Sequence, residues 1–185
     1  MMLLKNRFIA LYSLLLFSTI CNAQIEVVHV SLKNFKATGL GSFLNVSIPI
    51  TDANYITAEG GVQFLKNSDE EELSMIPVLL GFRYTLNKSG SGIYVEPNAG
   101  YNFGSSTIGK YDEIGSPISD ENGRYVYEKV SGLSTGIGVG YLFEPSGKIQ
   151  FNVGLRYLRS FGETPVNTFS FRISHAFTFG RRSNQ

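Results

Sequence analysis

The stretch from Ser131 to Tyr157 decides the fold, and it reads SGLSTGIGVGYLFEPSGKIQFNVGLRY. Every second residue from Leu133 to Phe143 is apolar or Thr, and the residues between them are Ser, Gly and Leu. After the turn-forming letters EPSG the same period returns, with apolar residues at every second position from Ile149 to Tyr157. A period of two is typical of β-strands, whose side chains alternate between the two faces of a sheet. The stretch therefore predicts two strands that share one apolar face, while the other face is polar or bare.

The same period covers most of the chain after residue 23. The predicted strands are Ile25–Lys33, Thr38–Ile50, Tyr55–Leu65, Leu73–Leu86, Ile93–Gly104, Ser131–Phe143, Lys148–Ser160 and Thr168–Gly180. Most have 10 to 14 residues, whereas strands of soluble proteins have about 5–6 residues and strands that cross a bilayer need about 9–11. Length therefore favours an all-β fold, an eight-stranded antiparallel up-and-down transmembrane β-barrel whose apolar face meets lipid.

The predicted connections alternate in length. The short set reads TDAN, NKSGSG and EPSG, and the more varied set reads NFKA, KNSDEEE, the 26 residues Ser105–Val130, and FGETPVN. Transmembrane barrels place short turns in the periplasm and longer loops outside the cell. This pattern predicts that the N- and C-termini both lie in the periplasm.

Aromatic residues gather near the predicted strand ends, as in the aromatic belts of membrane barrels. Those predicted at the periplasmic rim are Tyr55, Tyr84, Tyr141, Phe143, Phe177 and Phe179, and those at the outer rim are Phe64, Tyr101, Phe103, Tyr157 and Phe169. Aliphatic residues such as Ile48, Leu80 and Val139 lie between the two sets.

The N-terminal segment is predicted to be a secretory signal peptide. Lys5 and Arg7 precede an apolar run that is too short to span a bilayer, and small residues precede the expected cut after Ala23. The predicted division is a signal peptide at 1–23 and an outer-membrane β-barrel domain at 24–185.

Cys21 is the single cysteine, and it lies inside the predicted signal peptide. The alternative is a lipoprotein that is cut in front of Cys21, although Ile20 stands where such signals carry a small residue. Removal of the segment leaves no thiol, disulfide or cysteine metal site. It also leaves 14 basic residues against 15 acidic ones, which gives no electrostatic case for nucleic acid.

Four segments resemble a known group of proteins. They are IPVLLGFRYTL at Ile76–Leu86, YVEPNAGYNFG at Tyr94–Gly104, GIGVGYLF at Gly136–Phe143 and FSFRISHAFTF at Phe169–Phe179. The chain resembles the small eight-stranded outer-membrane barrels of the OmpA/OmpX type, within the porin-like outer membrane protein β-barrel domain family. The resemblance implies the outer membrane of a Gram-negative bacterium, contact with outer-membrane lipid, and recognition of the C-terminal strand by the barrel-insertion machinery. The chain departs from the family pattern because it continues through GRRSNQ after the last aromatic residue.

The inward face carries a predicted polar cluster. Glu59, Arg83 and Glu96 lie at one level when counted from the periplasmic turns, so Arg83 is expected within ion-pair reach of Glu59 or Glu96. Arg156 and Arg172 lie higher, with no obvious acidic partner at their level. One interpretation is structural, because side chains fill an eight-stranded barrel and buried charges are paired. The other is a gate or an anion site at Arg156 and Arg172.

No catalytic, cofactor-binding or metal-ligating set is predicted. Glu59 and Glu96 have the residue type for acid/base chemistry, but an Arg lies between them and there is no cleft. The two histidines, His29 and His175, and the absence of a mature cysteine give no metal-ligand spacing. The acidic run Asp69–Glu72 is either a solvated loop or a site where cations bridge to lipid headgroups.

The connection Ser105–Val130 is the candidate binding surface. Its middle, GSPISDENG, is expected to turn back on itself, and RYVYEKV is expected to form a strand. The sixth strand is thus predicted to begin near Tyr125 and to pair with an extension of the fifth as a hairpin. Tyr111, Tyr125 and Tyr127 would then be exposed for a protein partner, whereas the alternative is a disordered loop.

Four functions are compatible with these patterns. The leading one is a non-enzymatic outer-membrane protein that is structural or presents its extracellular loops for binding, and the alternative is a narrow porin-like channel for small solutes or ions. A membrane-embedded lipid enzyme would need a catalytic group beside a lipid-sized pocket. A soluble lipocalin-like barrel would reverse the two faces of every strand.

Overall fold

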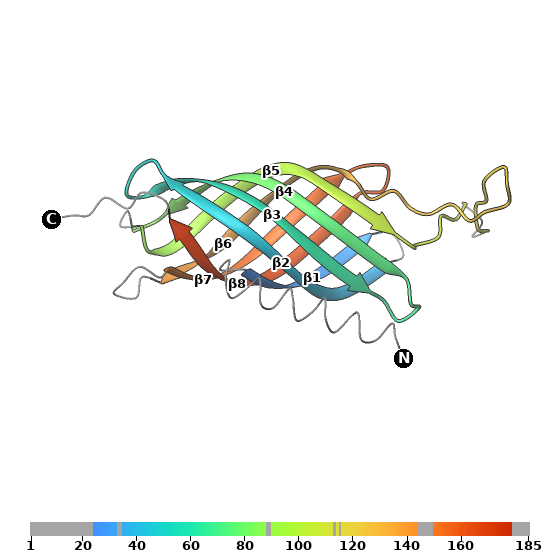
Figure 1. Cartoon of the computed structure of the whole chain (residues 1–185), viewed down its shortest axis with the longest axis horizontal. Coiled ribbons are helices and arrows are strands. Elements are labelled where there is room, and N and C mark those ends of the chain that lie inside the picture. The colour runs from blue at the N-terminus through green and yellow to red at the C-terminus, as the bar shows by residue number, and fades with distance from the viewer. Residues whose placement is uncertain are drawn as a thin grey trace, which may run out of the picture.

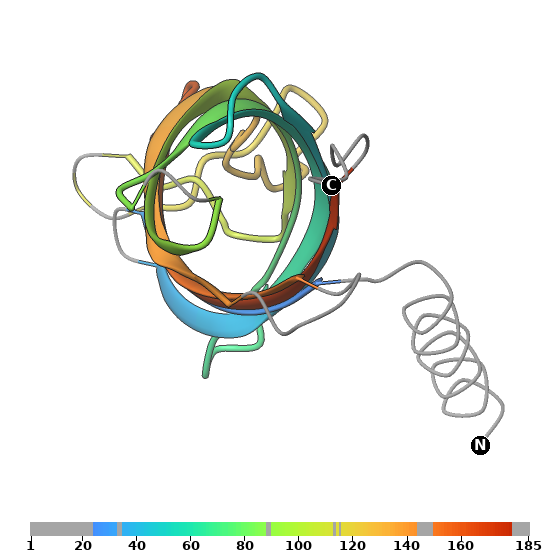
Figure 2. The ribbon, with the colours of Figure 1, turned by 90° about the vertical axis from the view of Figure 1, so that its left-hand side faces the viewer.

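The computed structural model describes residues 24–32, 35–87, 90–112, 114, 116–143 and 150–178. All eight predicted strands are present: β1 (Gln24–Leu32), β2 (Phe35–Pro49), β3 (Asn54–Lys66), β4 (Glu72–Thr85), β5 (Gly92–Ser106), β6 (Gly132–Phe143), β7 (Gln150–Phe161) and β8 (Val166–Thr178). Each strand pairs with the next, and β8 pairs with β1, so the antiparallel barrel is closed (Figures 1 and 2). The predicted fold class is therefore confirmed. The predicted signal peptide lies outside the described residues, none of which forms a helix long and apolar enough to cross a membrane.

The alternation that predicted β6 sets the two faces of the barrel wall. Leu133, Val139 and Phe143 face outward, with Leu133 67 % exposed, whereas Ser134 and Leu142 face the lumen and are each 1 % exposed. The same outward apolar band covers the other strands. The predicted face assignment is confirmed, and the reversed arrangement of a lipocalin-like barrel is excluded.

The aromatic residues predicted for the outer rim all face outward. Their exposed fractions lie between 38 % and 58 %; they are Phe64, Tyr101, Phe103, Tyr157 and Phe169. The prediction that Tyr55 belongs to the aromatic belt at the periplasmic rim is wrong, because Tyr55 is buried in the lumen. It lies on β3 an even number of residues from Thr57 and Glu59, which also face inward, so alternation excludes it from the lipid side. The side chain of Phe177 and all of Phe179 lie outside the described residues.

The connections fall at two ends of the barrel. The short-turn end holds the connections 50–53 and 86–91, and the long-loop end holds 67–71, 107–131 and 162–165, with the longest projecting beyond the rim (Figure 1). At the long-loop end β2 begins at Phe35, so the predicted loop NFKA is wrong in its last three residues. Phe35 and Ala37 are buried in the lumen, and this packing outweighs the weak local preference of the segment.

The lumen has two layers of different polarity. The layer at the long-loop end is an apolar cluster of Val28, Val30, Leu32, Phe35, Ala37, Leu65, Leu73, Met75, Ile108, Val130 and Val166. The layer toward the short-turn end holds the buried ion pairs between arginine and glutamate side chains. Outward residues beside the apolar layer, such as Lys36, Thr38, Lys66 and Glu72, are polar and exposed. The wall therefore inverts its polarity at this end, as expected where strands leave lipid and enter water.

Candidate functional site

One ion pair in the lumen joins β4 to β5. Nε of Arg83 donates to Oε2 of Glu96 at 2.6 Å, and the two side chains are 5 % and 7 % exposed. The Thr57 hydroxyl donates to Oε1 of Glu96 at 2.9 Å, and the Arg83 guanidinium lies 4.9 Å from the centre of the Tyr94 ring. The predicted contact between Arg83 and Glu96 is thus formed, within a shell of further polar and aromatic groups.

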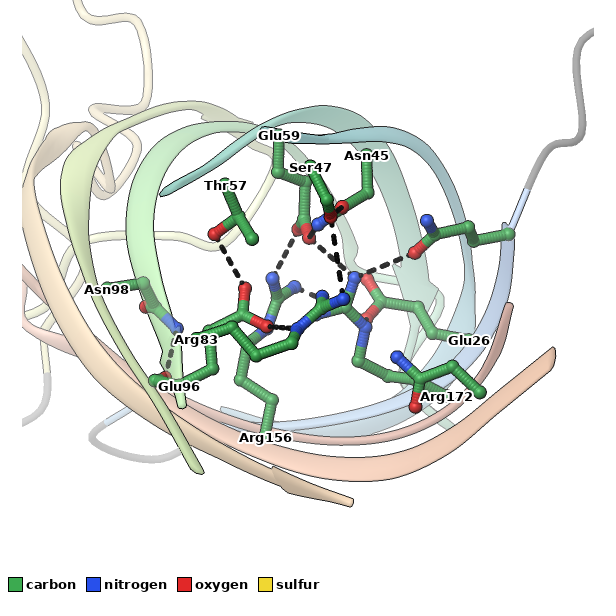
Figure 3. A network of polar contacts seen from close by, with 12 residues as sticks. Glu26, Asn45, Ser47, Thr57, Glu59, Arg83, Glu96, Asn98, Arg156 and Arg172 are labelled. Atoms are coloured by element: carbon green, nitrogen blue, oxygen red, sulfur yellow. Dashed lines mark hydrogen bonds and ion pairs between the residues drawn. The ribbon is translucent and has the colours of Figure 1, made fainter. Parts of the chain in front are cut away.

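A second ionic group joins β1, β3, β7 and β8 (Figure 3). Glu59 pairs with Arg156, and its Oε2 accepts from Nη2 of Arg172 at 2.6 Å. Glu26 lies 3.3 Å from Nη2 of Arg156 and 4.0 Å from Nε of Arg172. Both guanidiniums also lie over the Phe43 ring, at 5.3 Å for Arg156 and 4.0 Å for Arg172. Two carboxylates and two guanidiniums therefore share one buried cluster.

The expectation that Arg156 and Arg172 lack acidic partners is wrong, and with it the observation that motivated a gate or an anion site there. Counting residues up from each turn placed these arginines above Glu59, but the strands of a barrel are tilted and staggered, so equal counts are not equal heights. Glu26 was missed, although Ile25 and Val27 face outward and alternation then directs Glu26 into the lumen. With Glu26 included, three arginines meet three glutamates.

This arrangement is suited to stability rather than to chemistry. Every carboxylate of the two groups already contacts a guanidinium, so none is an unpaired acid or base. Among the described residues no set of three or more His, Cys, Asp or Glu side chains could hold a metal ion. An eight-stranded barrel is just wide enough to be filled by side chains, and here ion pairs fill one layer and apolar groups the other.

The long connection forms the predicted hairpin in part, because Gly109 makes an antiparallel bridge with Tyr127 and the N–H of Glu128 donates to the carbonyl of Ile108 at 2.9 Å. β5 ends at Ser106 and β6 begins at Gly132, so the prediction that the sixth strand begins near Tyr125 is wrong. The N–H of Lys110 donates to the carbonyl of Val126, that of Val126 to Ile118, and that of Ile118 to Lys110, each at 2.8–3.0 Å. A third segment around Ile118 therefore pairs with both of the segments that were expected to pair, and these two also pair with each other.

Two turns of the same geometry shape this segment, where the sequence predicted one reversal. Oδ1 of Asp112 accepts from the N–H groups of Ile114 and Ser116. Oδ1 of Asp120 accepts in the same way from Asn122 and Arg124. Side chains that accept local N–H groups stabilise tight turns. Residues 108–112, 114 and 116–128, called the knob below, thus have an ordered structure and not that of a disordered loop.

The knob exposes large side chains and is anchored at its base. Tyr111, Tyr125 and Tyr127 are 51 %, 65 % and 50 % exposed, as predicted, and Ile114 is 87 % exposed. At the base, the Thr164 hydroxyl of the β7–β8 connection contacts the buried Glu128 carboxylate. The Thr164 N–H donates to the Lys129 carbonyl at 3.2 Å, and the Lys129 ammonium pairs with Glu163 at 3.1 Å.

Solved structures share this architecture. Neisserial surface protein A (NspA) matches with a TM-score of 0.55 at 15 % identity, over 84 % of this chain and 94 % of that one. The chain has the fold of the small eight-stranded outer-membrane barrels. Ail, the attachment invasion locus protein of Yersinia pestis, matches with a TM-score of 0.47 at 14 % identity over 83 % and 94 % of the two chains. The outer membrane enzyme PagL matches with 0.47 at 11 % identity over 82 % and 97 %. No family model matches the sequence, and the search of curated proteins found no match.

At these identities the likeness to NspA shows the fold alone, and TM-scores below 0.5 carry no further argument. The predicted resemblance is confirmed at the level of fold. The roles of the lumen and of the knob must be argued from the chain itself.

Proposed function

We propose that the chain is an integral outer-membrane protein of a Gram-negative bacterium that presents the knob to a protein partner outside the cell. The observation that carries this proposal is an ordered projection with four large exposed side chains, Tyr111, Ile114, Tyr125 and Tyr127. Exposed aromatic groups held by a rigid scaffold are the usual anchors of protein interfaces. In this proposal the protein is not an enzyme, both termini lie in the periplasm, and the C-terminal strand is recognised by the insertion machinery.

The filled lumen supports binding over conduction. A channel would need a continuous polar path, whereas the apolar cluster lies across one layer and the six paired charges across the other. A single layer of ion pairs can rearrange, but the apolar layer offers no hydrogen bonds to a hydrated ion. We therefore expect no single-channel steps from the purified protein in planar bilayers.

Cysteine labelling tests the orientation, because the sequence after residue 21 contains no cysteine. Glu121→Cys in the knob should react with a membrane-impermeant maleimide on intact cells. Asp52→Cys, in the turn at the opposite end, should react only after the outer membrane is permeabilised. The reverse pattern would contradict the proposed orientation.

Site-specific photocrosslinking tests the partner. A photoreactive residue at Tyr125 should give a discrete protein adduct on living cells, and the same residue at Ser68, exposed in the β3–β4 connection, should not. With the photoreactive residue at Ile114, the double change Tyr125→Ser and Tyr127→Ser should remove the adduct while the barrel stays folded. Equal adducts at Tyr125 and Ser68, or none in the knob, would refute a partner-binding role.

A further inference from the structure

The outward face of β7, β8, β1 and β2 carries a polar patch at the long-loop edge of the apolar band. Directly opposed residues on these four strands form rows around the wall. One row is Arg159, Asn167, Ser31 and Lys36; the next toward the short-turn end is Tyr157, Phe169, His29 and Thr38; the third is Leu155, Phe171, Val27 and Leu40. The character of the rows thus changes from cationic and polar, through mixed aromatic and polar, to fully apolar.

Arg159 lies within the edge of the apolar band and not beyond it. Phe161, two residues closer to the long-loop end on the same strand, faces outward and is 51 % exposed. Leu133, which pairs with Phe161 across β6 and β7, is likewise exposed. The Arg159 guanidinium lies 5.4 Å from the centre of the Phe161 ring, so its side chain extends toward the long-loop end. This is the snorkelling expected of an arginine at the boundary between hydrocarbon and headgroups.

The polar groups of this patch are mainly hydrogen-bond donors. Oδ1 of Asn167 accepts from the Tyr157 hydroxyl at 2.8 Å, which leaves the Asn167 amide N–H groups directed elsewhere. Nδ1 of His29 lies 3.0 Å from Oγ1 of Thr38. Neither Arg159 nor Lys36 forms an ion pair with another described residue. Among the described outward side chains of these four strands none is Asp or Glu.

The strand next to the patch, β3, differs in charge, and its Lys66 lies directly opposite Thr38 of the patch. Lys66 on β3 has two carboxylates beside it, with Glu70 at 3.8 Å and Glu72 at 4.0 Å. A mobile anion would therefore gain little at Lys66. The patch and the adjacent strand thus present different binding chemistry, and the donors on β7, β8, β1 and β2, four strands with no described outward Asp or Glu, favour an anion.

We propose that this patch binds the negatively charged phosphate headgroup of a lipid in the surrounding leaflet, with the acyl chains along the row of Leu155, Phe171, Val27 and Leu40. Neighbouring strands lie about 4.8 Å apart, so Arg159 and Asn167 can donate to oxygens of one phosphate. Lys36 lies two strands beyond Asn167, where its ammonium adds charge above the same headgroup. A guanidinium binds phosphate oxygens through parallel hydrogen bonds. It should bind a phosphatidylcholine headgroup more weakly, because the choline cation there cancels the phosphate charge. The inference rests on membrane residence but not on the knob.

The test counts lipids retained by the folded full-length barrel. The protein is placed in nanodiscs of phosphatidylcholine and phosphatidylglycerol with identical acyl chains, and native mass spectrometry measures the retained molecules of each. The wild type should retain phosphatidylglycerol preferentially. Arg159→Gln and Lys36→Gln should each lower that preference about fivefold, which is the effect expected of one cation near a membrane surface. Lys66→Gln, the matched control on β3, should keep the wild-type preference.

Three results would overturn the proposal: no preference in the wild type, an unchanged preference in the Arg159→Gln, Lys36→Gln double variant, or an equal loss in Lys66→Gln. Displacement of phosphatidylglycerol by inorganic phosphate at similar concentration would also overturn it, since the site would then be one for free anions. Mobility in SDS gels without heating shows that each variant is folded, and removal of an outward charge at this depth should not hinder insertion. Photocrosslinking from the knob in the same variants distinguishes a failure of the lipid-binding proposal from a failure of the partner-binding proposal, because the two are measured separately.

Discussion

The ion pair between Arg83 and Glu96 allows the contribution of the charged lumen to be measured. Arg83→Met removes the cation and leaves the Glu96 carboxylate, 7 % exposed, with the Thr57 hydroxyl as its remaining hydrogen-bond donor among the described residues. Removal of one partner of a buried pair is expected to cost about 3–5 kcal/mol, because the other charge stays buried without compensation. The same change also removes the guanidinium from the Tyr94 ring, which adds a smaller loss.

The double variant separates charge from packing. Arg83→Met with Glu96→Leu removes both charges and leaves apolar groups of similar volume, so its stability should return to within about 1–2 kcal/mol of the wild type. The matched control is Lys129→Met, whose ammonium pairs with Glu163 on the surface, where the two side chains are 74 % and 55 % exposed. That change should cost less than about 1 kcal/mol.

Equilibrium unfolding in urea from lipid vesicles gives the free energies. The chain has no Trp, so the folded fraction is best followed by circular dichroism and by gel mobility without heating. If the double variant proved as unstable as Arg83→Met alone, the loss would come from packing around Tyr94, and the argument from a stranded carboxylate would be refuted.

Two further predictions concern the backbone. Gly138→Ala on β6 should leave stability unchanged or raise it by about 0.4–1 kcal/mol, because an added Cβ would lie 3.6 Å from its nearest neighbour. Gly136→Ala on the same face should destabilise the barrel, because its Cβ would overlap the Tyr157 carbonyl oxygen. Equal urea midpoints for the pair would contradict this reasoning. Glu70 has a φ of 65° in the β3–β4 connection, so Glu70→Gly should be more stable than Glu70→Ala by about 1 kcal/mol. Both variants lose the contact with Lys66, and an equal stability would show that the left-handed backbone carries no strain.

The strands could be predicted because their signal is local. In β6 the period of two alone determines which face of the sheet each side chain lies on, so that Val139 faces outward and Leu142 faces inward. The same reasoning placed Arg83 and Glu96 together, since they lie on adjacent strands near one short turn. The prediction failed at Tyr55 because it followed the expected position of the aromatic belt, which faces lipid. The alternation along β3 places Tyr55 in the lumen, and the alternation was correct.

The second ionic group could not be predicted in the same way. Glu26 and Arg156 are 130 residues apart, and Glu59 and Arg172 are 113 apart. Their meeting depends on the stagger of the closed barrel, which is a property of all eight strands together. The third segment of the knob was missed for a related reason, because Ile118 forms hydrogen bonds with both of the other segments and its surroundings carry no distinct periodic pattern.

The layered lumen links the charged cluster to the knob. Ile108 and Val130 at the base of the long connection belong to the apolar cluster, so the knob is continuous with the layer that separates the ionic groups from water at the long-loop end. A charge below that layer cannot be neutralised by solvent from this side, which explains why three arginines and three glutamates are needed together. The same layer fixes the base of the knob, since Glu128 is buried against Thr164 beside it. The barrel thus supports the exposed tyrosines from an interior in which three arginines are balanced by three glutamates below a layer that is apolar where it meets the knob.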